Sequence, residues 1–164
     1  MTSKWMNEPQ EAGGAMPKVL IVDDSPAQLY SLRQLVEQAG HQALVAESGE
    51  QALEVAAMEH PAVILMDIVM PDVDGVEAIR QIMAESPAAR IIALTMYRQE
   101  QYMLDAIRAG ARGYLLKTVD ASELLAAIEV VQRGDYLIDP VIAARVLSEL
   151  HRVTQPTPRS EPLT

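Results

Sequence analysis

The chain has 164 residues, 49% of them hydrophobic, which suffices for one globular domain with a full core and a small appendage. Its 23 acidic residues outnumber 13 basic ones, so its surface disfavours nucleic acid and favours cations and basic partner surfaces. Cysteine is absent, which excludes disulfides and thiolate metal sites. No apolar stretch is long enough for a membrane helix, and the N-terminus lacks a secretory signal, so we expect a cytoplasmic protein without membrane contacts.

Short apolar runs alternate with segments of helical periodicity five times along the chain. The apolar runs have the length of strands buried on both faces and lie at 18–22, 43–46, 63–67, 91–94 and 113–116. The helical segments lie between Pro26 and Gly40, Ser48 and Pro61, Val76 and Ser86, Met103 and Gly110, and Leu124 and Gly134. This alternation predicts an α/β fold with a doubly wound parallel sheet. Right-handed crossovers leave few topologies, of which we adopt the flavodoxin-like (βα)5 type with strand order 2-1-3-4-5.

The two ends of the chain differ in composition from its centre. Residues 1–16 are polar and without periodicity, which predicts a flexible leader, and residues 17–134 hold the five strand–helix units. Residues 135–151 are predicted to form a linker with one extra C-terminal helix. An apolar stripe along that helix predicts packing on its own domain, pairing with a second copy, or both in turn. Residues 152–164 contain three prolines and are typical of a flexible tail or interdomain linker.

Four of the five predicted strands end in a functional group. The first ends in Asp23 and Asp24, the third in Asp67, the fourth in Thr95 and the fifth in Lys117. Because carboxyl ends of parallel strands meet at one edge of a sheet, these groups are expected to converge. Three carboxylates repel one another unless a cation lies among them, and oxygen ligands without His or Cys favour Mg²⁺. With a hydroxyl and an ammonium to hold an anion, this set suits phosphoryl transfer onto a carboxylate.

The motifs around these groups carry a family resemblance. They are Val-Asp-Asp at 22–24, Leu-Met-Asp-Ile-Val-Met-Pro-Asp-Val-Asp-Gly at 65–75, Leu-Thr at 94–95 and Gly-Tyr-Leu-Leu-Lys at 113–117. Each motif is weak alone, but their order and spacing are highly specific. Over roughly residues 17–134 the chain resembles a bacterial two-component response-regulator receiver domain, a module that assists its own Mg²⁺-dependent phosphorylation and is no conventional enzyme.

The resemblance implies an acceptor and a metal site. Asp67 would be the phosphoacceptor, attacking a phosphohistidine on a sensor histidine kinase. Asp24 would bind Mg²⁺ directly, Asp23 largely through water, and the backbone carbonyl of Val69 would complete the metal shell. A simpler alternative for Asp23 and Asp24 is a role as helix caps.

The resemblance also implies a switch. Lys117 would pair with the phosphoryl oxygens, while Thr95 would move toward the phosphoryl group and Tyr114 would rotate inward behind it. The alternatives are that Thr95 and Lys117 are ordinary residues at strand ends, and that Tyr114 is a half-buried sheet-edge tyrosine that does not switch.

Several positions depart from the commonest pattern of the family. Thr118 follows Lys117 where many relatives have proline in a cis peptide, so the isomer of this bond is open. Met96 stands where relatives carry a small residue, and Val69 and Tyr97 are bulky and not acidic at positions bordering the path of hydrolytic water. We therefore predict a slowly decaying phosphoryl group.

The segment after residue 134 resembles the exit of NarL/FixJ (LuxR-type) regulators. In those proteins a linker leads to a helix-turn-helix DNA-binding domain, and Leu163-Thr164 match the start of such a domain. We expect the chain to reach DNA only through that missing domain, to control transcription, and to form a homodimer on phosphorylation. The alternative is a stand-alone or degenerate receiver that acts as a protein-interaction module.

Two rival classes remain to be weighed. An aspartyl phosphohydrolase usually needs a second acid two residues after its nucleophile, where this chain has Val69. A flavodoxin-like cofactor binder needs a glycine-rich phosphate loop after the first strand, where this chain has the acidic segment 23–26. Both rivals are disfavoured.

Overall fold

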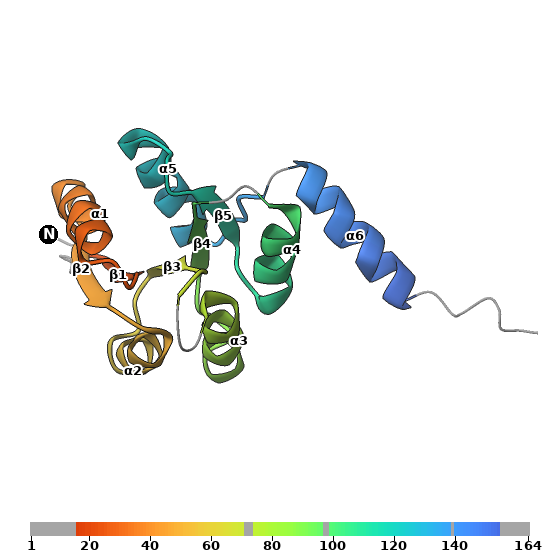
Figure 1. Ribbon diagram of the computed structural model, residues 1–164, viewed down its shortest axis with the longest axis horizontal. Helices are drawn as coiled ribbons and strands as arrows, with labels where there is room; N and C mark the ends of the chain where they lie inside the picture. Colours follow the sequence, from red (N-terminus) through yellow and green to blue (C-terminus); the bar gives the residue numbers. More distant parts are fainter. Residues whose placement is uncertain (1–15, 71–73, 97–98, 139, 155–164) are drawn as a thin grey trace, which may run out of the picture.

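A five-stranded sheet with helices on both faces forms the core of the protein (Figure 1). The computed structural model describes residues 16–70, 74–96, 99–138 and 140–154. The strands are β1 (Lys18–Val22), β2 (Gln42–Ala46), β3 (Val63–Asp67), β4 (Ile91–Thr95) and β5 (Gly113–Leu116). The helices are α1 (Pro26–Gln38), α2 (Gly49–Glu59), α3 (Gly75–Glu85), α4 (Glu100–Ala109), α5 (Ala121–Gln132) and α6 (Pro140–Thr154). The predicted alternation of strands and helices is confirmed.

All strand pairs are parallel, and their order is β2-β1-β3-β4-β5, which confirms the predicted flavodoxin-like topology. In the strand order, β2 lies on one side of β1, and the chain then crosses to β3 and β4 on the other side of β1. Between β1 and β3 the sheet therefore has the switch point at which open α/β folds form a crevice. Because all five strands are parallel, their carboxyl ends lie along one edge of the sheet, which we call the carboxyl edge.

Each strand sends alternate side chains to two separate apolar layers. Leu20 and Ile64 pack toward α2, α3 and α4, whereas their neighbours Ile21 and Leu65 pack toward α1 and α5. Figure 1 shows α1 and α5 on one side of the sheet, with α2 and α3 on the other. Burial of each such side chain contributes roughly 1.5–3 kcal/mol, so the strands are held rigidly from both faces. Without phenylalanine, the core consists of aliphatic side chains and methionine.

Side-chain caps set where four of the helices begin. Ser25, Ser48, Asp74 and Asp120 each accept a hydrogen bond from a backbone N–H in the first turn of α1, α2, α3 and α5. Such caps typically stabilise a helix by about 1 kcal/mol. Because Ser25 caps α1, neither the Asp23 nor the Asp24 carboxylate is the cap of this helix.

The segment between α5 and α6 runs along the outer edge of β5. Leu137 forms an isolated parallel bridge with Gly113, and its N–H donates to the Arg112 carbonyl over 2.8 Å. The Arg112 guanidinium donates to the Gly134 carbonyl over 2.9 Å and lies 5.1 Å from the centre of the Tyr136 ring. These contacts attach the linker to the sheet before α6 starts.

Helix α6 is longer than predicted and packs against α4 (Figure 1). The sequence prediction ended it near His151, but it continues to Thr154, since no glycine or proline interrupts the chain before Pro156. The predicted leader at 1–16 and tail at 152–164 lie almost wholly outside the described residues. Among the described helices, none combines the length and apolar character needed to cross a membrane.

Candidate functional site

The buried polar side chains of the described residues gather at the carboxyl edge of the sheet. Asp23, Asp67 and Thr95 are at most 2% exposed, and they follow or end β1, β3 and β4. The Lys117 side chain, directly after β5, is 9% exposed. Since burial of polar groups is costly, this concentration at one edge is typical of a functional site.

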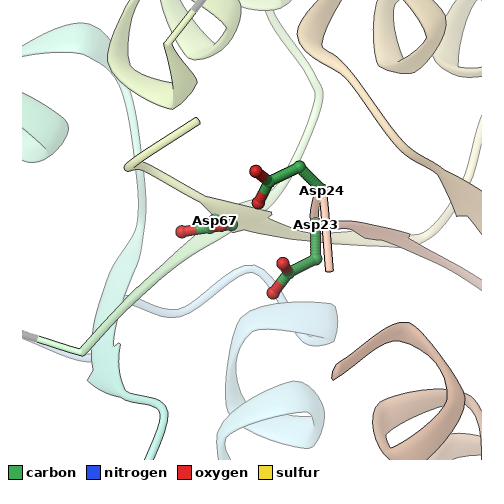
Figure 2. A group of neighbouring side chains, drawn as sticks. All are labelled: Asp23, Asp24 and Asp67. Atoms are coloured by element: carbon green, nitrogen blue, oxygen red, sulfur yellow. The ribbon is translucent and has the colours of Figure 1, made fainter. Parts of the chain in front are cut away.

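Figure 2 shows Asp23, Asp24 and Asp67 at the ends of β1 and β3. One carboxylate oxygen of each lies within 4.8 Å of the others, and Asp24 is the exposed member of the group. Oδ1 of Asp23 accepts a hydrogen bond from the Ser25 N–H over 3.0 Å, and its buried Oδ2 faces the Lys117 ammonium. The three side chains offer only hard carboxylate oxygens, one of them exposed to solvent, so this cluster fits a divalent cation such as Mg²⁺.

The Lys117 ammonium lies between the two buried carboxylates. Its Nζ is 2.8 Å from Oδ2 of Asp23 and 3.2 Å from Oδ2 of Asp67. The Lys117 N–H donates to the Thr95 carbonyl over 2.8 Å, which continues the pairing of β4 and β5 and directs the lysine to the site. The Lys117–Thr118 peptide bond, whose isomer the sequence left open, is trans.

Burial and charge act against each other in this cluster. Burial raises the pKa of Asp67 to about 6, repulsion from Asp23 adds to the rise, and the Val69 N–H and Lys117 oppose it. Burial by itself lowers the pKa of Lys117, but the Asp23 and Asp67 carboxylates outweigh that effect and raise it. The lysine therefore stays protonated beside the two buried carboxylates.

Backbone contacts hold Asp67 in place from the loop that follows it. The Val69 N–H donates to Oδ1 of Asp67 over 3.1 Å, and the Gly75 N–H donates to the Ile68 carbonyl over 3.3 Å. A Cβ atom on Gly75 would lie 2.2 Å from the Asp67 carbonyl oxygen, so only glycine fits here. The motif at 65–75 includes this glycine, but its close approach to the Asp67 carbonyl was not predicted, although an Asp-Gly pair at a helix start was an available signal.

Exposed apolar side chains form part of the rim of the site. Val69 is 47% exposed and Met96 is 53% exposed, and they follow the strands that end in Asp67 and Thr95. Tyr97, also expected at this rim, lies outside the described residues. This part of the rim is thus apolar beside an acidic centre.

Tyr114 lies further from the sheet edge than Thr95. Its partner in the strand register is Ala93, whereas Thr95 pairs with Leu116. The Tyr114 side chain is half-buried and packs against both the core beneath α2, α3 and α4 and the contact between α4 and α6. Tyr114 therefore joins the core of the domain to its C-terminal helix.

The fold and the site define a flavodoxin-like α/β domain with an acidic centre at its topological switch point. The family profile described as response regulator receiver domain matches residues 19–129. This chain belongs to the response regulator receiver domain family, and it is the receiver domain of a two-component response regulator. Receiver domains are signalling modules.

Individual relatives differ in how much of their own length this chain matches. The protein PilH of Pseudomonas aeruginosa is 45% identical over 121 residues, which cover 73% of this chain and 100% of PilH. YxjL of Bacillus subtilis, named an uncharacterized transcriptional regulatory protein, is 36% identical over 88% of this chain and 67% of its own length. The crystal structure of a LuxR-family two-component response regulator from Aurantimonas sp. SI85-9A1 matches with a TM-score of 0.73 and 32% identity, covering 84% of this chain and 99% of that one.

Proposed function

We propose that this chain takes a phosphoryl group onto Asp67 from a phosphohistidine of a sensor histidine kinase. The observation that carries the proposal is the Lys117 ammonium between the two buried carboxylates, with a third acid within 4.8 Å. A carboxylate oxygen of Asp67 forms a bond to phosphorus while the phosphorus–nitrogen bond breaks, and the electron pair of that bond leaves with the imidazole. The products are an aspartyl phosphate and free histidine.

The surrounding residues divide the work of binding charge. Asp23, Asp24, Asp67 and the Val69 carbonyl would hold Mg²⁺, whose chemistry when bound is to offset negative charge during transfer. Lys117, which already contacts Asp67, would move its ion pair onto the phosphoryl oxygens. Lys117 and Mg²⁺ would thereby offset the negative charge that a phosphoryl group adds to the buried Asp67 carboxylate.

Thr95 and Tyr114 form the proposed switch. The Thr95 hydroxyl would donate to a phosphoryl oxygen, and Tyr114 would turn inward behind it. Phosphorylation can shift the domain only by the difference in contacts between its two states, and these two side chains supply that difference. The module thereby signals without turnover of a small substrate, which separates it from a conventional enzyme.

The proposed output is control of transcription in the cytoplasm, through a helix-turn-helix domain beyond this chain and a homodimer formed on phosphorylation. Two relatives support it, the transcriptional regulatory protein YxjL and the LuxR-family regulator, which match 88% and 84% of this chain. The second candidate is a stand-alone receiver that acts through protein contacts, and the full-length match to PilH favours it. A phosphorylation-dependent shift in size-exclusion elution supports the first, and a monomer in both states supports the second.

The test of phosphorylation is intact-mass measurement after treatment with Mg²⁺ and acetyl phosphate. We expect one base-labile phosphoryl adduct on the native chain and on Asp135→Asn, an exposed matched control, and none on Asp67→Asn. An adduct on Asp67→Asn would place the acceptor elsewhere. If neither an adduct nor Mg²⁺-dependent binding of beryllofluoride, a phosphoryl analogue, occurred on the folded native chain, the chain would act only as an interaction module.

A further inference from the structure

An apolar cluster joins α6 to α4. Met103 and Leu104 of α4 and Ile142 of α6 are at most 6% exposed and contact one another. Ile107 and Val146 pack around them from the same two helices. We call this set the α4–α6 cluster, and it covers an apolar face that α4 would otherwise expose.

Two ion pairs of opposite direction fix how α6 lies on α4. Arg108 of α4 binds Glu149 of α6 through both carboxylate oxygens, with 2.8 Å between Nε and Oε1. In the reverse sense, Arg145 of α6 lies 2.7 Å from Glu100 of α4. Exposed ion pairs add little stability, but a reciprocal arrangement selects one register of the two helices. The contact is therefore specific as well as apolar.

Tyr114 connects this contact to the acceptor site. It packs against the α4–α6 cluster and against the core cluster that includes Met66, the neighbour of Asp67. It also lines a groove of about 460 Å³ together with Met103 and Ile138. An inward turn of Tyr114 would remove its packing from the α4–α6 cluster.

We infer that α6 is an intramolecular latch: docked on α4, it holds the acceptor site in its unphosphorylated state, and phosphorylation releases it. This inference rests on the proposed function, because it uses the movement of Tyr114 toward Thr95. Coupling between two sites is reciprocal, so weakening the latch must tighten binding at the acceptor site. The segment that phosphorylation releases from α4 is thus α6 of the same chain.

The test compares beryllofluoride affinity in the presence of Mg²⁺ between the full chain and latch variants. Ile142→Ala removes a buried latch side chain, and Leu147→Ala removes one that is 66% exposed on the same helix. We expect Ile142→Ala to raise the affinity by about fivefold or more and Leu147→Ala to leave it within about twofold of native. Glu149→Arg should act like Ile142→Ala, and adding Arg108→Glu, which restores the ion pair in reverse, should return the affinity toward native.

Hydrogen exchange of α6 supplies a second readout. We expect Mg²⁺ with beryllofluoride to speed exchange of the α6 amides in the native chain, and Ile142→Ala to speed it without ligand. Beryllofluoride binding with unchanged α6 exchange, or equal affinities for Ile142→Ala and Leu147→Ala, would overturn the latch alone. No binding to the native chain would instead overturn the proposed function, and the latch with it.

Discussion

Replacing Asp67 by asparagine is expected to stabilise the protein when magnesium is absent. In the native chain, burial and the nearby Asp23 raise the pKa of Asp67 from 3.8 to about 6. That rise corresponds to about 3 kcal/mol against the ionised carboxyl at neutral pH. This cost already includes the attraction of Lys117, and the variant removes it but leaves a buried amide in place of the carboxyl. We therefore expect a net gain of about 1–2 kcal/mol in the free energy of unfolding.

The gain should depend on pH in a defined direction. Because the folded-state pKa lies above the unfolded value, the folded native chain binds the proton more tightly, so acidification stabilises it relative to the variant. The cost that Asp67→Asn removes should be full above about pH 7 and fall to about one third near pH 4.5, so the advantage of the variant should disappear near that pH. Native stability should also rise with added Mg²⁺, while that of the variant should respond less.

Urea unfolding in EDTA, followed by circular dichroism across this pH range, measures both effects. Asp135→Asn is the control, because its side chain is 67% exposed and should leave stability unchanged at every pH. The reasoning is refuted if Asp67→Asn is less stable than native at neutral pH in EDTA, or if its advantage does not shrink on acidification.

Three further predictions concern the same site. Gly75→Ala should destabilise the protein by about 2 kcal/mol or more, because its Cβ would lie 2.2 Å from the Asp67 carbonyl oxygen; an unchanged urea midpoint would contradict this contact. Lys117→Met should lower stability in EDTA by about 3 kcal/mol, since it leaves two buried carboxylates without their cation, and Mg²⁺ should recover part of the loss in the same urea assay. With Val69 and Met96 at the rim, the aspartyl phosphate should have a half-life longer than about one minute in intact-mass time courses, and faster decay would show that this rim does not exclude water.

The sheet and its acidic edge could be predicted because their signals are periodic and local. Five apolar runs separated by capped helical segments leave few topologies, and a parallel sheet brings the residues after β1, β3, β4 and β5 to one edge. The approach of Asp67 and Lys117, 50 residues apart, follows from topology, but the placement of the lysine between Asp23 and Asp67 depends on side-chain geometry that spacing does not contain.

The features missed from sequence are contacts between segments. The close approach of Gly75 to the Asp67 carbonyl depends on how α3 leaves the β3 loop, which no periodicity reports. The apolar stripe of α6 predicted packing but not its partner, since a stripe fits equally on the same domain or on a second copy. Arg108 and Arg145 form the ion pairs that specify α4 as the helix on which α6 packs. Their acidic partners could be identified only once both helices were placed.

The attachment of the linker to β5 also makes α6 a lever. Leu137 is bridged to Gly113, so the segment before α6 moves with the sheet, and any reorientation of the helix must arise close to its start. A helix of 15 residues is about 22 Å long, and a tilt of about 20° at Pro140 would carry its far end by about 8 Å. An ångström-scale movement of a side chain near the sheet would thus displace Thr154 by nearly the width of a helix.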